Sequence, residues 1–182
     1  MDRYEMRLSG SGGQGLILAG KIMAEAVVIY DGHNAVQTQS YGPEARGGAS
    51  KAEVVIADGE IDYPKVLNLD LLLALTQVSC TKYSKDLRDG GTLIVDSGLV
   101  NDLPKGNFKV YKAPITDIAI KKVGKAVVTN IVALGILTRI SGVVSEDAMR
   151  KAILARVPKG TEELNMKAFD EGIKAAAEML ST

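Results

Sequence analysis

The sequence has very few of the residues that bind metals or stack on nucleic-acid bases. Its 182 residues include one cysteine (Cys80), one histidine (His33), no tryptophan, six tyrosines and two phenylalanines. One cysteine excludes an intrachain disulfide, a cysteine zinc site and a cysteine-held iron–sulfur cluster. One histidine disfavours a histidine metal site, and so few aromatic residues disfavour base stacking. We therefore expect no metal site in this chain.

The sequence also lacks an excess of charge and a long hydrophobic run. Lys plus Arg total 22 and Asp plus Glu total 22, so the net charge is zero, which argues against non-specific nucleic-acid binding. The longest apolar stretch, residues 126–140, is shorter than the roughly 20 residues that a membrane span needs. The first residues do not resemble a signal peptide. We expect a soluble cytoplasmic protein with neither nucleic acid nor membrane as a partner.

The charge is unevenly distributed along the chain. Residues 1–100 carry 9 basic and 13 acidic groups, whereas residues 101–182 carry 13 basic and 9 acidic groups. Between residues 105 and 125, six lysines accompany one acid, Asp117. This run is either a solvated surface or a docking face for an anionic ligand or an acidic partner.

Hydrophobic patterning predicts an α/β fold with a mostly parallel sheet. The apolar run at residues 69–76 is typical of a strand buried on both faces, as parallel sheets require. Strands that alternate with helices indicate this fold class. We predict a single domain over residues 1–182, with an α/β core to about residue 142 and C-terminal helices over residues 143–182. Predicted strands cover residues 4–9, 33–39, 49–57, 69–76, 92–96 and 107–112, and predicted helices cover residues 16–30, 78–88, 114–123, 128–141, 145–157 and 161–180.

A glycine-rich loop follows the first predicted strand. Residues 10–15 read Gly-Ser-Gly-Gly-Gln-Gly, which contains G-x-G-x-x-G between a strand and a helix and gives the fold a Rossmann-like start. Glycines allow close backbone approach, and the N–H groups of a helix N-terminus favour an anion. No acid ends the second predicted strand, so an NAD dehydrogenase is disfavoured. The loop either binds another phosphate-bearing ligand, contacts a protein, or forms a tight crossover without a ligand.

A second loop, residues 41–50, reads YGPEARGGAS. Gly47 and Gly48 beside Arg46 would let a ligand or partner approach the main chain, and the guanidinium could bind a carboxylate or phosphate. Alternatively, this is a structured surface loop in which Arg46 pairs with Glu44 or Asp31.

Together these motifs resemble the gamma subunit of 2-oxoacid:ferredoxin oxidoreductases, and most closely the 2-oxoglutarate type. The resemblance runs from GSGGQG and YGPEARGGAS through EVVIAD (residues 53–58), IDYP (61–64), GGTLIVDSGLV (90–100) and NIVALG (130–135), and so extends to about residue 142. It implies oxidative decarboxylation of a 2-oxoacid with coenzyme A, giving an acyl-CoA, carbon dioxide and reduced ferredoxin.

The resemblance also implies a division of labour among subunits. Thiamine diphosphate and Mg²⁺ would belong to alpha and beta subunits, and the iron–sulfur clusters to a ferredoxin-like delta subunit or elsewhere in the complex. This chain would carry no catalytic residue, would pack on the thiamine subunits and would help to bind coenzyme A. The residues expected to bind it are Gly10, Gly12, Gly13, Gln14, Gly15, Arg46, Gly47, Gly48 and Asn130.

Three points stay open at the level of sequence. Asn130 is either a ligand-binding residue or a helix amide bonded to a neighbouring loop. The chain is alternatively a purely structural assembly subunit, or the gamma subunit of a pyruvate or other 2-oxoacid enzyme. A stand-alone nucleotide-dependent oxidoreductase is the weaker alternative, because the ribose-binding acid is missing.

Overall fold

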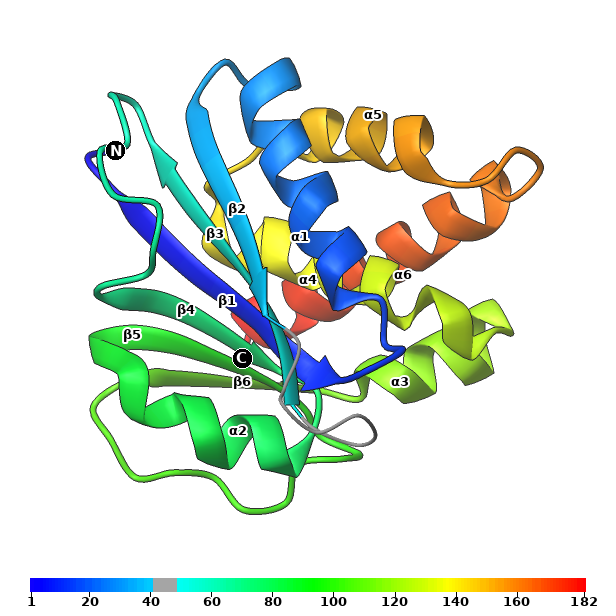
Figure 1. Ribbon diagram of the computed structural model, residues 1–182. Helices are drawn as coiled ribbons and strands as arrows, with labels where there is room; N and C mark the ends of the chain where they lie inside the picture. The colour runs from blue at the N-terminus through cyan, green and yellow to red at the C-terminus, as the bar shows by residue number, and fades with distance from the viewer. Residues whose placement is uncertain (41–48) are drawn as a thin grey trace.

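Six strands form one sheet in the order β2-β3-β1-β4-β5-β6 in the computed structural model, which describes residues 1–40 and 49–182 (Figure 1). The strands are β1 (Tyr4–Ser11), β2 (Asn34–Ser40), β3 (Ala49–Ala57), β4 (Leu69–Ala74), β5 (Leu87–Asp96) and β6 (Lys109–Ala113). The helices are α1 (Leu16–Glu25), α2 (Gln77–Tyr83), α3 (Ile115–Asp117), α4 (Thr129–Ser141), α5 (Glu146–Arg156) and α6 (Glu162–Leu180). Among the described residues, no helix is both long enough and apolar enough to span a bilayer.

The strand directions confirm the predicted α/β fold with a mostly parallel sheet. β1, β4, β5 and β6 run parallel to one another, whereas β3 is antiparallel to both of its neighbours, β1 and β2. The start of the fold differs from a dinucleotide-binding unit in one respect, because β3 separates β2 from β1. The end of β2 therefore does not lie beside the end of β1, where an NAD-binding acid would stand.

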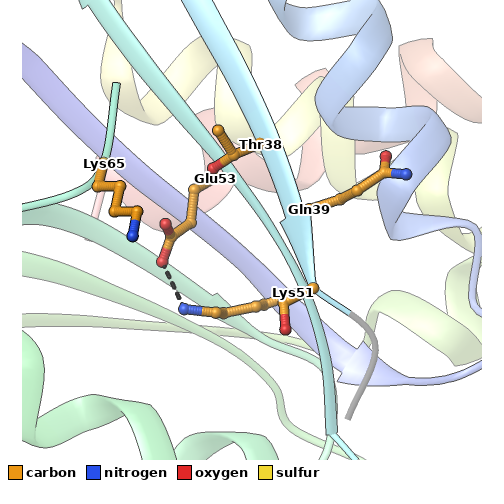
Figure 2. Close-up of a pocket in the computed structure, with 6 residues that line it drawn as sticks. Thr38, Gln39, Lys51, Glu53 and Lys65 are labelled. Carbon is orange, nitrogen blue, oxygen red and sulfur yellow. Dashed lines mark hydrogen bonds and ion pairs between the residues drawn. The ribbon is translucent and has the colours of Figure 1, made fainter. Parts of the chain in front are cut away.

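The two faces of the sheet are covered differently. α1, α4, α5 and α6 lie on one face and α2 lies on the other (Figure 1). On the α2 face, Arg7 of β1 is 5% exposed and its Nε donates to Glu53 of β3 at 2.8 Å. Lys51 Nζ also donates to Glu53, at 2.9 Å (Figure 2). This face thus carries a cluster of paired charges beside a second, smaller apolar cluster that includes Leu72, Tyr83 and Leu93.

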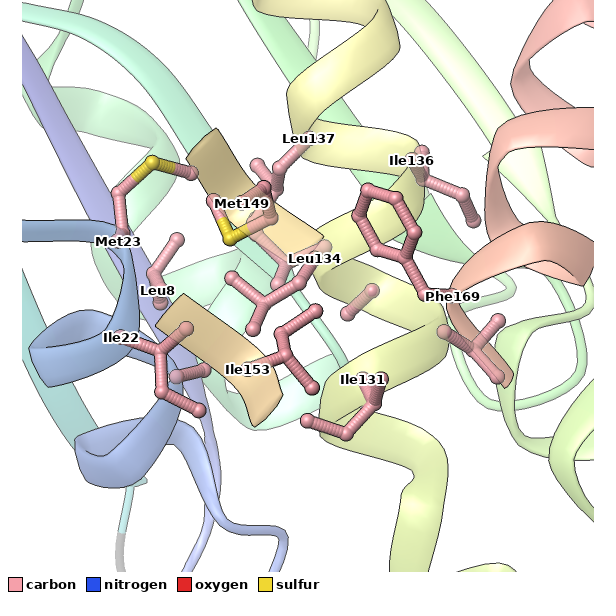
Figure 3. Close-up of a cluster of buried hydrophobic side chains, with 14 of the residues drawn as sticks. Leu8, Ile22, Met23, Ile131, Leu134, Ile136, Leu137, Met149, Ile153 and Phe169 are labelled. Carbon is pink, nitrogen blue, oxygen red and sulfur yellow. The ribbon is translucent and has the colours of Figure 1, made fainter. Parts of the chain in front are cut away.

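The main core lies between the sheet and the helices α1, α4, α5 and α6 (Figure 3). α4 is buried along residues 129–138, as its nearly all-round apolar pattern predicts. It packs closely on α6 through Gly135 and Gly172, since a Cβ added to Gly172 would come within 3.0 Å of the Gly135 Cα. Side chains from four helices and β1 fill the space around it: Leu8, Ile22, Met23, Ile131, Leu134, Ile136, Leu137, Met149, Ile153 and Phe169.

Two predicted helices change their winding before they end. Residues 16–30 form α1 followed by a π-helical segment, Ala26–Tyr30, in which the Asp31 N–H donates to the Ala26 carbonyl five residues earlier. Residues 114–123 likewise end in a π-helical segment, Ile118–Val123.

The prediction of a helix over residues 78–88 is wrong at its end. α2 stops at Tyr83, a short 3₁₀ turn covers Ser84–Asp86, and β5 begins at Leu87. Residues 87–91 belong to the sheet and not to a helix, because Leu87 pairs with Leu69 of β4. Arg88 Nε also donates to the Asp70 carboxylate of β4 at 2.5 Å. Gly90 and Gly91 therefore lie within a strand.

Candidate functional site

The glycine turn lies at the point where the chain connections of the sheet change sides. β1 and β4 are adjacent and parallel, and β1 continues into α1 on one face while β4 continues into α2 on the other. In open α/β sheets, ligands bind outside the carboxyl ends of the strands at such a switch point. The turn between Ser11 and Leu16 occupies that place.

The chain's own hydrogen bonds brace the turn. Gln14 Oε1 accepts from the Ser11 N–H at 2.7 Å, and the Gln14 N–H donates to the Ser11 carbonyl at 3.4 Å. A Cβ on Gly10 would lie 2.2 Å from Gln14 Oε1, so a larger residue there would displace the Gln14 side chain from its hydrogen bond with Ser11. Gly13 and Gly15 have φ of +88° and +72°, a backbone region that favours glycine.

Asn130 supports the other side of the turn. Its Nδ2 donates to the Gly15 carbonyl at 3.2 Å, and the residue is 5% exposed. A Cβ on Gly15 would lie 2.6 Å from that Nδ2. This geometry confirms the interpretation of Asn130 as a helix amide bonded to a neighbouring loop. Its Oδ1 accepts no hydrogen bond from the described residues and is left for a further contact.

A cavity of about 400 Å³ opens beside the turn. Gly13, Gly15 and Asn130 line it, so three of the predicted site residues meet there. Its walls are mostly apolar and also come from α1, α4 and the segment that joins α5 to α6: Leu18, Val127, Val128, Ile131, Val157, Pro158, Thr161, Leu164 and Asn165. The contribution of the α5–α6 segment could not be predicted, because nothing in the residues 157–165 signals a ligand.

Three helices begin at this cavity. Gly15, Val128 and Thr161 stand at the N-termini of α1, α4 and α6, and none of these termini is capped by a side-chain hydrogen bond. Uncapped N–H groups and the positive end of each helix dipole favour an anion. Lys125 and Lys159 are exposed in the adjoining loops and form no ion pair within the described part of the chain. The cavity thus joins an apolar wall to the N-termini of three helices, of which α6 also carries Glu162 and Glu163 in its first turn.

The remaining predicted site residues have different outcomes. Gly12 lies in the turn with open space beside it. Arg46, Gly47 and Gly48 lie outside the described residues. The strand ends that flank this gap are both fixed, since Ser40 pairs with Lys51 and Ala49 pairs with Ser11 at the end of β1.

Cys80, His33 and Asp96 do not line the cavity beside the glycine turn. Cys80 is fully buried in α2, and burial raises the pKa of its thiol, which disfavours a thiolate nucleophile. His33 Nδ1 lies 2.9 Å from Asp58 Oδ1. Asp96 accepts from the N–H and Oγ1 of Thr116, at 2.8 and 2.6 Å, and so caps the start of α3. Within the described residues, no three His, Cys, Asp or Glu side chains are grouped so as to hold a metal ion.

Known proteins match this chain along nearly its whole length. The family model described as pyruvate ferredoxin/flavodoxin oxidoreductase matches residues 5–175. The 2-oxoglutarate synthase subunit KorC of Methanocaldococcus jannaschii is 52% identical over 179 residues, which are 97% of this chain and 96% of that protein.

Two solved structures share the fold. The keto/oxoacid ferredoxin oxidoreductase gamma subunit from Geobacter sulfurreducens has a TM-score of 0.92 at 55% identity, covering 98% of this chain and 99% of that chain. The 2-oxoglutarate:ferredoxin oxidoreductase from Magnetococcus marinus has a TM-score of 0.85 at 20% identity, covering 98% of this chain and 32% of that longer chain. The same fold therefore occurs alone and as a part of a longer polypeptide. The motifs, the sheet topology and these matches agree: the chain belongs to the pyruvate ferredoxin/flavodoxin oxidoreductase family.

Proposed function

We propose that this chain is the gamma subunit of a multisubunit 2-oxoglutarate:ferredoxin oxidoreductase and that its glycine turn helps to bind coenzyme A. The enzyme would convert 2-oxoglutarate and coenzyme A to succinyl-CoA and carbon dioxide, passing the electrons to ferredoxin. Alpha and beta subunits would hold thiamine diphosphate and Mg²⁺, and a ferredoxin-like delta subunit the iron–sulfur clusters. The chain would work in the cytoplasm.

The coenzyme A proposal rests on the open space beside Gly12. A Cβ at this position would meet nothing among the described residues within 4 Å, and its φ lies outside the left-handed region. Gly10, Gly13 and Gly15 each have a packing or backbone reason to be glycine, but Gly12 has neither. A glycine that the described residues do not require, in a turn at a switch point, is explained if a ligand approaches the backbone there.

The cavity beside the turn fits the chemistry of coenzyme A. The ligand carries a pyrophosphate and a 3′-phosphate, which suit the N–H groups at the starts of α1 and α4, whose first turns carry no acid. Its uncharged pantetheine arm suits the apolar wall formed by residues such as Leu18 and Ile131. The arm also carries amide N–H groups, for which Asn130 Oδ1 is an available acceptor.

The test measures the dependence of dye reduction on coenzyme A in the purified complex, with 2-oxoglutarate saturating. We expect Gly12→Ala to raise the KM for coenzyme A about tenfold, a loss of about 1.4 kcal/mol of binding, because the methyl group occupies the ligand's approach. The melting temperature of the chain should not change, since the methyl group enters open space.

Gly59→Ala is the matched control. Gly59 also has nothing within 4 Å of its added Cβ and no left-handed φ, but it lies in the turn after β3, away from the cavity. Its KM for coenzyme A should equal that of the wild type. An unchanged KM in Gly12→Ala would refute the coenzyme A site. Loss of that variant from the complex on gel filtration would instead support the alternative of a purely structural assembly subunit.

A further inference from the structure

Asn165, near the start of α6, is a buried amide on the wall of the cavity beside the glycine turn. The residue is 6% exposed. Its Nδ2 donates to the Thr161 carbonyl at 2.9 Å and to Thr161 Oγ1 at 3.1 Å. An amide nitrogen has two hydrogens, so these two bonds use both of them and fix the orientation of the side chain.

The other polar atom of this amide, Asn165 Oδ1, has open space beside it. It accepts no hydrogen bond from any described residue. In the part of the chain that the structure describes, the enclosed side-chain atoms without a hydrogen-bond partner are Ser141 Oγ and Glu171 Oε2, so Asn165 Oδ1 is not enclosed. Asn130 presents the same arrangement from α4, with Nδ2 bonded to the Gly15 carbonyl and Oδ1 without a partner. Two available acceptors from two helices therefore line one cavity.

The chemistry of the cavity favours a neutral ligand segment that donates hydrogen bonds. Of the described residues that line the cavity, none is charged and most are apolar. A charged ligand group placed there would lose its hydration without gaining an opposite charge. An N–H group of a neutral chain needs only an acceptor, which Asn130 and Asn165 supply. The cavity thus matches a chain in which apolar groups alternate with amides.

The occupied Nδ2 of Asn165 argues against an adenine ring at this position. Asparagine recognises adenine through two bonds at once, one accepted from N6 and one donated to N7. Both Nδ2 hydrogens of Asn165 are already bonded to Thr161, so only the accepting half of that pair is left. A secondary amide N–H requires only the acceptor. The geometry therefore favours the amide-bearing arm of coenzyme A over its nucleotide.

We propose that Asn165 Oδ1 accepts a hydrogen bond from one amide N–H of the pantetheine arm of coenzyme A, and Asn130 Oδ1 from the other. The ligand is that of the proposed function, on which this inference rests. The phosphates would lie at the glycine turn, and the arm would follow the apolar wall between α4 and α6. Asn165 would then determine specificity, because it distinguishes a ligand with an amide arm from a nucleotide that carries the same phosphates.

Asn165→Leu removes the acceptor while the hydrogen bonds around Thr161 are kept. The Thr161 carbonyl still accepts from the backbone N–H of residue 165 at 3.0 Å. Thr161 Oγ1 still donates to the Pro158 carbonyl at 2.6 Å. Leucine has nearly the shape of asparagine and adds to the apolar wall, so the variant should fold and assemble.

Two analogues of coenzyme A, each with one arm amide N–H replaced by a methylene group, test the proposal in the purified complex. Each analogue should raise the KM of the wild type about fivefold, because it loses one hydrogen bond. Asn165→Leu should raise the KM for coenzyme A itself about fivefold, with kcat unchanged. With one of the two analogues this variant should show no further rise, because the donor and its acceptor are then both absent.

Thr138→Val is the matched control. Thr138 is 2% exposed in α4, and its Oγ1 donates to the Leu134 carbonyl four residues earlier at 2.7 Å, as Asn165 Nδ2 donates to the carbonyl of Thr161. Thr138 does not line the cavity. The variant loses a buried helix hydrogen bond but should keep the wild-type KM for coenzyme A and for both analogues. Thermal unfolding of each variant confirms that it folds.

Three outcomes would overturn the inference. An unchanged KM for coenzyme A in Asn165→Leu would mean that Oδ1 binds only water. A further rise with both analogues in that variant, as large as in the wild type, would mean that neither arm amide contacts residue 165. Weaker competitive inhibition of Asn165→Leu than of the wild type by adenosine 3′,5′-bisphosphate would mean that the nucleotide occupies the cavity.

The Gly12→Ala variant separates failure of this inference from failure of the proposed site. A raised KM for coenzyme A in Gly12→Ala with an unchanged KM in Asn165→Leu would contradict the inference alone. An unchanged KM in both variants would contradict the coenzyme A site itself.

Discussion

The contact between α4 and α6 predicts that Gly172→Ala destabilises the fold. A Cβ at residue 172 would lie 2.2 Å from the Val132 carbonyl oxygen and 3.0 Å from the Gly135 Cα. Both are backbone atoms of α4, so no side chain can turn aside to make room. An ordinary contact needs at least 3.4 Å, and the helices must therefore separate by about 1.2 Å, the difference between the two distances.

The size of the effect follows from this separation. A gap of 0.5 to 1 Å already forfeits about a quarter to a half of the dispersion energy across an interface, and overpacking of this kind costs about 1–3 kcal/mol. Because no side-chain movement relieves the clash, we place the cost at about 3 kcal/mol. The higher helix propensity of alanine relative to glycine offsets about 1 kcal/mol of this cost. The net loss of about 2 kcal/mol lowers the melting temperature by about 4–8 °C in a domain of this size.

Thermal unfolding followed by circular dichroism measures this loss. Gly59→Ala, whose methyl group enters open space, serves as the control and should melt within about 1 °C of the wild type. A Gly172→Ala variant that melts at or above the wild-type temperature would refute the reasoning, since it would mean that α4 and α6 have room for the methyl group.

Two further predictions concern the polar groups of β1. Burial raises the pKa of Tyr4 to about 12, with a smaller contribution from Asp70. As the pH rises, the unfolded chain therefore loses the phenolic proton of Tyr4 at a lower pH than the folded chain does. The free energy of unfolding should fall as the pH rises from about 10 to 12. Urea unfolding at pH 9 and 11 should show a smaller fall for Tyr4→Phe than for the wild type. Arg7→Met removes the guanidinium that donates to Glu53 at 2.8 Å and lies 5.0 Å from the centre of the Tyr83 ring. We expect the free energy of unfolding in urea to fall by about 2 kcal/mol, because Lys51 still donates to Glu53 at 2.9 Å. The double variant Arg7→Met with Glu53→Met should recover part of this loss, and no recovery would contradict a pairwise contribution.

Much of the fold could be predicted because local patterns and tertiary structure agree. The continuous apolar run at residues 69–76 predicts β4, which the structure places in the middle of the parallel part of the sheet. Ser145 followed by two acids predicts the start of α5, and Ser145 Oγ does accept from the Ala148 N–H at 3.1 Å. The glycine turn was predicted from its position between a strand and a helix, and its place at the switch point supports that interpretation.

Other features depend on contacts between residues far apart in the sequence. The insertion of β3 between β1 and β2 could not be predicted, since each strand has the pattern that it would have in another order. Glu5 and Arg7 alternate with apolar residues, a pattern typical of a strand with one solvated face, yet they are only 2% and 5% exposed. Their burial depends on ion pairs and hydrogen bonds with distant groups such as Glu53.

For the candidate site, sequence could identify the turn but not the cavity beside it. The wall contributed by residues 157–165 follows from how α5 and α6 return to the turn, which no local motif encodes. The support of Gly15 by Asn130 joins residues 115 positions apart. The interpretation of Asn130 as a loop-bonding amide anticipated such a contact but could not name its partner.

The position of β1 in the sheet has a consequence for the newly made chain. β1 is synthesised before the other strands of this sheet, but its two neighbours are β3 and β4, which end at Ala57 and Ala74. At about 5–20 residues per second, the ribosome needs several seconds to complete β4 after β1. In the first part of that interval, until β3 is complete, Met6 and Leu8, which are fully buried in the final structure, have no neighbouring strand. β1 is thus exposed to chaperones and to other nascent chains for longer than any later strand of the sheet.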